Sequence, residues 1–120
     1  MQSNESQEMY LETILVLSQS KEHVRSVDVA NDLGFKKSSV SVAMKNLREE
    51  KLIQVDEKGY LTLTPAGKEI AEMIYERHQF LSEYLKKIGV PAEIADEDAC
   101  RIEHVISKES FEAIKNHIKK

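Results

Sequence analysis

The chain has 120 residues and a formal net charge of −4, with 41% hydrophobic and 32% charged residues. This composition supplies a core for one compact domain or two small subdomains, and it excludes wholesale disorder. No run of about 18 apolar residues occurs, so we expect no membrane-spanning helix. The start of the chain lacks the charged and apolar segments of a secretory signal, and a single cysteine cannot form an internal disulfide. We therefore expect a cytoplasmic protein.

The first half of the chain has the pattern of a winged helix-turn-helix. Helical spacing of apolar residues and turn signals predict three helices and two strands, over residues 7–20, 27–33, about 38–50, 52–55 and 60–63. Ser26 is the predicted N-cap of the second helix, which ends at Gly34, and Ser38 or its neighbour is the predicted N-cap of the third helix. A loop that ends in Gly59 joins the strands into a hairpin. Two helices joined by a glycine-containing turn and followed by a hairpin are typical of a winged helix.

The second half of the chain predicts helices only. Thr64 and Pro65 are typical of an N-cap and first turn, and the helix that they begin extends to about Ile88. A further helix begins at Pro91, and Ser107 caps a last one. We expect a mostly α fold with a DNA-binding winged helix over residues 1–64 and a helical metal-binding and dimerisation domain over residues 65–120.

Local charge indicates where DNA would bind. Residues 36–51 carry a net charge of +3, and phosphate contact requires local cations rather than a basic chain as a whole. Serine hydroxyls at the start of the third helix add short hydrogen-bonding groups. The predicted DNA-binding residues are Arg25, Lys36, Lys37, Ser38, Ser39, Ser41, Lys45 and Lys58. Taken singly, each is also compatible with an ordinary surface residue or helix cap.

Soft and hard metal donors recur at helical spacing. Cys100, Glu103 and His104 stand at i, i+3 and i+4, which places a thiol, a carboxylate and an imidazole on one helix face. Such a mixed donor set suits late first-row divalent metals better than Mg²⁺ or Ca²⁺. Each residue alone is equally compatible with a core or surface position. Further donors on the first and fourth predicted helices are Met9, Glu12 and His78.

Four motifs resemble the diphtheria-toxin-repressor family of metal-dependent transcriptional regulators, which includes iron-dependent repressors and manganese transport regulators. They lie at residues 8–14 (EMYLETI), 63–67 (LTPAG), 77–78 (RH) and 98–105 (DACRIEHV). The resemblance implies a homodimer that binds a palindromic DNA operator. The chain is similar to the short two-domain members, without the SH3-like C-terminal domain of some iron-type members.

The resemblance also implies metal ligands. In the iron-type branch, the activating site matches Met9, Cys100, Glu103 and His104, and an ancillary site matches His78. Two ancillary positions differ, because Ser82 stands where glutamate is usual and Asp96 where histidine is usual; Asp96 remains a predicted ligand. The manganese branch has aspartate at position 9 and glutamate at position 100, and it shares ligands that match Glu12 and His78. A cluster of two metals is compatible with this set.

These residues predict a metal-dependent repressor that controls metal-homeostasis genes and has no enzymatic activity. Thioether and thiolate donors favour Fe²⁺ first and Mn²⁺ second, with Co²⁺, Ni²⁺ or Zn²⁺ able to bind in vitro. The alternatives are a manganese-responsive regulator of the same family and a winged-helix regulator that senses a small organic ligand. An enzyme that uses Cys100 with His104 lacks an orienting third group and a phosphate-binding loop. A metal-buffering protein without DNA binding does not account for the wing or the local charge.

Overall fold

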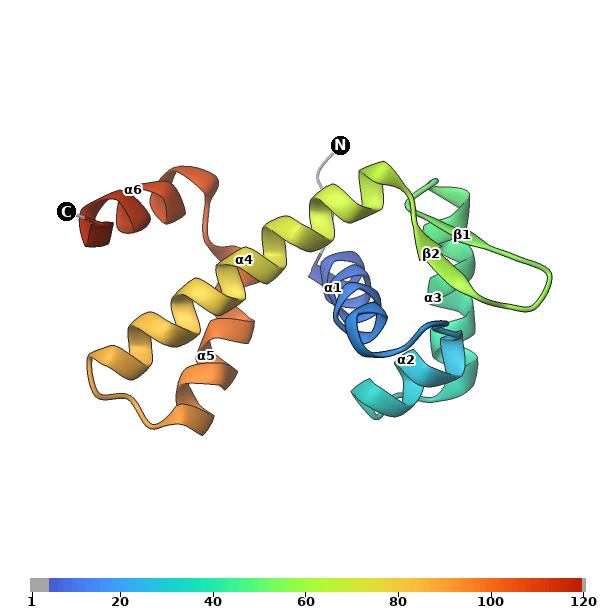
Figure 1. Ribbon diagram of the computed structural model, residues 1–120, viewed down its shortest axis with the longest axis horizontal. Coiled ribbons are helices and arrows are strands. Elements are labelled where there is room, and N and C mark those ends of the chain that lie inside the picture. The colour runs from blue at the N-terminus through green and yellow to red at the C-terminus, as the bar shows by residue number, and fades with distance from the viewer. Residues whose placement is uncertain (1–4, 120) are drawn as a thin grey trace. The chain divides into compact units, whose positions relative to one another are not determined.

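The computed structural model describes residues 5–119 and confirms the predicted mostly α fold (Figure 1). The chain divides into two compact units, one extending to Met73 and the other beginning at Ile74. The division falls within helix α4, Pro65–Lys87, whereas the predicted domain boundary at residues 64 and 65 lies at its first residue. Among the helices of the described residues, none is both long and apolar enough to span a membrane.

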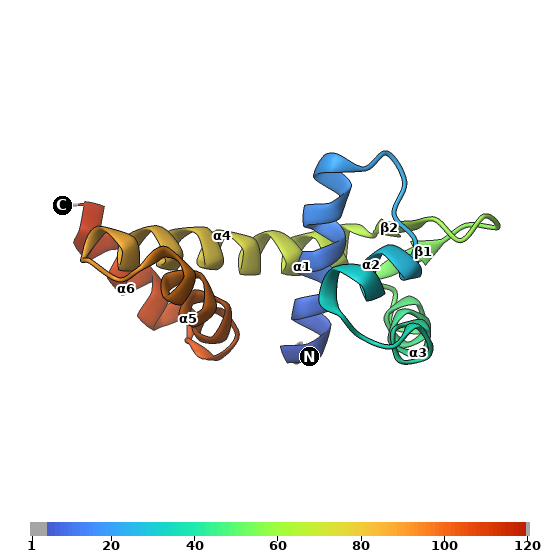
Figure 2. The ribbon, with the colours of Figure 1, turned by 90° about the horizontal axis from the view of Figure 1, so that it is seen from below.

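The first unit is a winged helix-turn-helix. It contains α1 (Glu5–Ser20), α2 (Ser26–Leu33), α3 (Lys37–Glu49), β1 (Ile53–Val55) and β2 (Leu61–Leu63). The strands pair antiparallel, with Ile53 opposite Leu63 and Val55 opposite Leu61, and their connecting loop projects from the unit beside α3 (Figures 1 and 2). The predicted apolar face of α3 is confirmed, because Val40, Met44 and Leu47 are buried in the core with side chains from α1 and the strands.

Two predicted helix caps are wrong. Ser26 is the first residue of α2, and the N-cap is Arg25, whose backbone N–H donates to the Asp28 carboxylate at 2.8 Å. This hydrogen bond is the main reason why the pKa of Asp28 lies below its usual range. The helix begins where it does because the acidic side chain in its first turn accepts the backbone N–H. Similarly, Lys36 is the N-cap of α3, so Ser38 lies inside the first turn.

Thr64 connects the backbone that follows α3 to the first turn of α4. The Thr64 hydroxyl donates to the Lys51 carbonyl at 2.7 Å and accepts the Gly67 backbone N–H at 3.2 Å, which confirms the predicted cap. The Thr64 backbone N–H donates to the Leu52 carbonyl at 3.1 Å. Gly67 packs so closely here that a Cβ would lie 2.0 Å from the Leu52 oxygen. Only glycine allows this approach of helix and backbone.

The second unit contains the remainder of α4 with α5 (Ala92–Val105) and α6 (Lys108–Lys119). Leu81, Ala99 and Phe111, one from each helix, form its buried core, and Phe80 packs edge-on against Phe111. Ser107 accepts the Ser110 backbone N–H at 3.0 Å, so the predicted cap of the last helix is confirmed. These contacts hold α5, which carries the predicted metal donors, against α4.

Replacing Gly67 with alanine is expected to lower the free energy of unfolding by about 3 kcal/mol, because the new methyl group would clash with backbone that cannot move aside. Chemical denaturation of both proteins measures the difference. Glu69→Ala, at an exposed position of the same helix, is the control and should change stability by less than about 0.5 kcal/mol. Equal stability of Gly67→Ala and the parent would contradict the close packing.

Candidate metal centre and nucleic-acid interface

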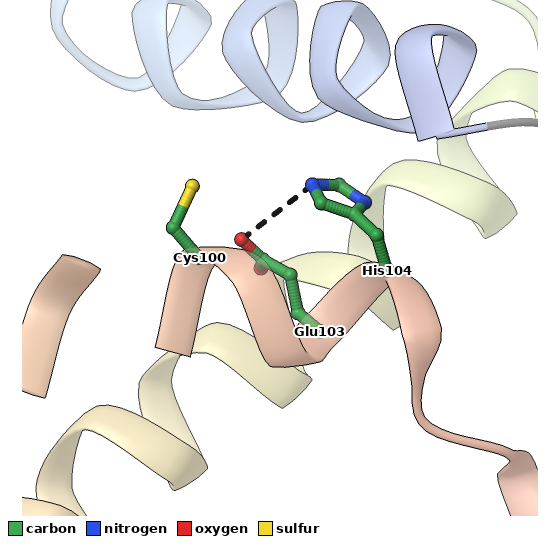
Figure 3. A group of neighbouring side chains, drawn as sticks. All are labelled: Cys100, Glu103 and His104. Atoms are coloured by element: carbon green, nitrogen blue, oxygen red, sulfur yellow. Dashed lines mark ion pairs between the residues drawn. The ribbon is translucent and has the colours of Figure 1, made fainter. Parts of the chain in front are cut away.

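Three predicted donors meet on one face of α5. One ligand atom each from Cys100, Glu103 and His104 lies within 4.8 Å of the other two. Figure 3 shows the three side chains side by side on α5. The His104 Nε2 atom is 3.8 Å from the Glu103 Oε1 atom. This grouping follows from helix geometry, since residues three and four apart share a face. The structure therefore brings together the donors that the sequence spacing paired.

The Glu103 carboxylate is the most unusual group of the site. Its side chain is 0% exposed, and neither oxygen has a hydrogen-bond partner among the described residues. The Nδ1 atom of His78, on α4, lies 3.5 Å from Oε1. A buried carboxylate is costly unless a cation or hydrogen-bond donors compensate its charge. Imidazole nitrogens and a thiol beside such an oxygen fit a divalent transition metal.

The remaining predicted metal donors are Met9 and Glu12 of the first unit and Asp96 of the second. Met9 and Glu12 are half-buried on α1, in the first unit, and their role as ligands stays a prediction. Asp96 lies near the start of α5, where it accepts a hydrogen bond from Ser82 and pairs with Lys86 at 3.3 Å. The Ser82 hydroxyl, followed by the Lys86 ammonium, holds the pKa of Asp96 below its usual range. The chain itself thus compensates the charge of Asp96.

The predicted DNA-binding residues all lie exposed on the first unit. They occupy the start and outer face of α3, the wing loop and the residue before α2, and comprise Arg25, Lys36, Lys37, Ser38, Ser39, Ser41, Lys45 and Lys58. Ser41, Lys45 and Arg48 line one side of a groove of about 250 Å³, and Gly59 and Leu61 line the other. Arg48 is a further exposed cation on this face, which the predicted DNA-binding residues do not include. Its position three residues after Lys45 and seven after Ser41 places all three on one helix face.

Family models cover both halves of the chain. Residues 3–65 match the N-terminal DNA-binding domain of iron-dependent repressors, and residues 64–120 match the metal-binding and dimerisation domain of the same proteins. The chain belongs to the DtxR/MntR family. This confirms the predicted family and, since its members are transcriptional regulators, the prediction that the chain is not an enzyme.

Several known proteins are similar to this DtxR/MntR member. The transcriptional regulator MntR of Bacillus pumilus is 34% identical over 109 residues, which are 91% of this chain and 76% of that protein. MntR of Salmonella typhimurium is 36% identical over 104 residues, covering 87% of this chain and 66% of that protein. These relatives support a metal-dependent transcriptional regulator.

Solved structures agree with the fold. IdeR of T. acidophilum superposes with a TM-score of 0.81 at 28% identity, over 94% of this chain and 54% of that one. The manganese regulator SloR gives a TM-score of 0.83 at 26% identity, over 99% of this chain and 55% of that one. This DtxR/MntR chain thus spans about half the length of these structures and about three quarters of the Bacillus relative.

Arg77 is a positioning residue that sequence reasoning missed in this DtxR/MntR chain. It is 7% exposed, and its Nη1 atom donates to the backbone carbonyls of Glu103 at 3.1 Å and Ile106 at 3.0 Å. The Glu103 carbonyl lies in the last turn of α5, and the Ile106 carbonyl belongs to its C-cap. Carbonyls at a helix C-terminus lack hydrogen-bond donors within the helix. The guanidinium thereby fixes the end of α5 that carries two donors. The only signal in the sequence was an arginine beside His78 in the RH motif.

Glu103→Gln should have opposite effects on stability and on metal binding. The amide keeps the shape but removes a buried negative charge, so chelator-treated protein should gain about 1–3 kcal/mol in unfolding free energy. Metal affinity should fall at least about 100-fold with the loss of a donor. Denaturation in chelator and anaerobic metal titration measure the two effects.

The exposed Glu97, on the same helix, provides the matched control. Glu97→Gln should leave both quantities unchanged. A loss of stability in chelator-treated Glu103→Gln would show that the protein itself compensates the buried charge, which contradicts a metal centre at this carboxylate.

Proposed function

We propose that this chain is an Fe²⁺-responsive repressor that binds a palindromic operator as a homodimer and controls metal-homeostasis genes in the cytoplasm. The observation that carries the proposal is the fully buried Glu103 carboxylate without a hydrogen-bond donor, beside Cys100, His104 and His78. A bound divalent ion supplies the missing positive charge. Metal-dependent stabilisation of this unit is therefore the expected basis of sensing.

The ligands proposed for the activating ion are Met9, Cys100, Glu103 and His104, with Glu12 and His78 available to a second ion. The thiol of Cys100 and the thioether of Met9 are soft donors, and they favour Fe²⁺ over Mn²⁺. Asp96 remains a weaker proposed ligand, because Ser82 and Lys86 already engage its carboxylate. Co²⁺, Ni²⁺ and Zn²⁺ are expected to bind the same donors in vitro.

Operator binding is proposed for the exposed face of α3 together with the wing. Two half-sites on one face of DNA lie about 34 Å apart, so a dimer must hold two copies of α3 at that separation. Exposed apolar side chains on the second unit, among them Ile94, Val105 and Ile118, offer a surface for a second copy of the chain. We therefore assign DNA binding to residues 1–64 and dimerisation to residues 65–120.

Metal binding is proposed to control DNA binding. Met9 and Glu12 lie on α1 of the DNA-binding unit, and the remaining donors lie on α4 and α5. An ion held by donors from both units restricts the separations that the two α3 helices of a dimer can adopt. Without the ion, the dimer samples separations that do not match the operator, and its affinity falls.

Mn²⁺ is the second candidate. Relatives with 34% and 36% identity are named MntR, and the solved SloR is described as a manganese regulator. Glu12 and His78 match manganese-type ligands, which supports this alternative. A regulator that senses a small organic ligand is the third candidate, and in that case chelator treatment would leave operator binding intact.

Anaerobic titration of operator binding distinguishes the metals. Fe²⁺ should activate the parent chain at a lower free concentration than Mn²⁺, because two of its proposed donors are sulfur atoms. Cys100→Glu replaces a soft donor with a hard one, so we expect the ratio of the Fe²⁺ and Mn²⁺ half-activation concentrations to shift about tenfold towards Mn²⁺.

Ala92→Glu adds the same charge at an exposed position of the same helix and serves as the control, with no expected change in metal preference. Cys100→Ala should remain folded but lose activation by metal. Activation of the parent by Mn²⁺ at a lower free concentration than Fe²⁺ would overturn the iron assignment and support the manganese alternative.

A further inference from the structure

A third short segment joins the wing. Val24 forms an isolated antiparallel bridge with Leu61, and the Leu61 backbone N–H donates to the Val24 carbonyl at 2.7 Å. Val24 and Leu61 are both buried in the core. Because side chains alternate along an extended segment, His23 and Arg25 lie on the opposite face from Val24, next to Tyr60.

Tyr60 contacts both of these residues. Its ring stacks on the His23 ring with centroids 4.1 Å apart and planes at 4°, and the Arg25 Cζ atom lies 4.9 Å from the Tyr60 centroid. Arg25 is exposed, and the His23 side chain is 52% exposed. The group therefore lies at the protein surface, on the wing side of α2, where it adds little to the buried core.

Backbone hydrogen bonds fix both sides of this group. The Arg25 N–H donates to the Asp28 carboxylate at 2.8 Å, as the N-cap of α2. The Tyr60 N–H donates to the Asp56 carboxylate at 2.9 Å, and the Lys58 N–H donates to the same oxygen at 2.9 Å. The ring and the guanidinium thus project from backbone that is held in place, and Lys58 adds a second cation on the wing loop.

We propose that Tyr60 is a positioning residue that orders the Arg25 guanidinium for contact with a DNA phosphate. An arginine over an aromatic face keeps its N–H groups free at the edge of the plane, where they match phosphate oxygens. The stacked His23 ring restricts the orientation of the Tyr60 ring. This inference rests on the proposed operator binding and adds to it a reason why the wing contains a half-buried aromatic residue beside Arg25.

The test measures the affinity of the full metal-loaded chain for a short duplex that the parent chain selects from a random pool, across a series of salt concentrations. Arg25→Ala should reduce the slope of log affinity against log salt by about one, the signature of one lost phosphate contact. Tyr60→Leu should weaken binding about threefold in the parent and have no further effect in Arg25→Ala. Tyr60→Phe retains the ring and should bind as the parent does.

A structural role for Tyr60 predicts a different result. Tyr60→Leu would then weaken binding by the same factor whether or not Arg25 is present, and this outcome overturns the proposal. So does an unchanged salt slope in Arg25→Ala. If Tyr60→Leu does not fold, His23→Leu replaces it and should weaken binding about twofold, again only where Arg25 is present. Failure of the parent chain to bind any duplex with metal would overturn the proposed function itself.

Discussion

A carboxylate buried without a hydrogen-bond donor is the constraint on which the second unit depends. The Glu103 side chain is fully buried, and neither of its oxygens has a hydrogen-bond partner among the described residues. The buried Arg77 donates through Nη1 to the backbone carbonyls of Glu103 and Ile106. Compensation of this charge is the role that we propose for the metal ion. This is the condition under which a fold can register the presence of a metal ion.

Two carboxylates of α5 differ in how the chain compensates their negative charge. Asp96 accepts a hydrogen bond from Ser82 and pairs with Lys86, so its negative charge is compensated at any metal concentration. Glu103 has histidine nitrogens at 3.5 and 3.8 Å but no such permanent cation. Burial and partners, rather than residue type or position in a motif, distinguish the two acids.

The sequence predicted what depends on local spacing and missed what depends on packing. The helices, the hairpin and the grouping of Cys100, Glu103 and His104 follow from helix and strand periodicity. The caps at Ser26 and Ser38 were misplaced by one or two residues, because Asp28 in the first turn supplies the hydrogen bond for α2 and no side chain caps α3. The contacts of Arg77, Lys86 and Tyr60 join residues on different elements, and periodicity within one element contains no information about them.

Thr64 and Gly67 connect the start of α4 to the backbone that follows α3. One threonine bonds to the Lys51 and Leu52 carbonyls directly after α3 and to the first turn of α4, while Gly67 allows α4 to pack against that same backbone. These hydrogen bonds and this close contact thus connect the end of α3, the wing and the start of α4. We therefore expect a rotation of the start of α4 to turn α3 and the wing with it.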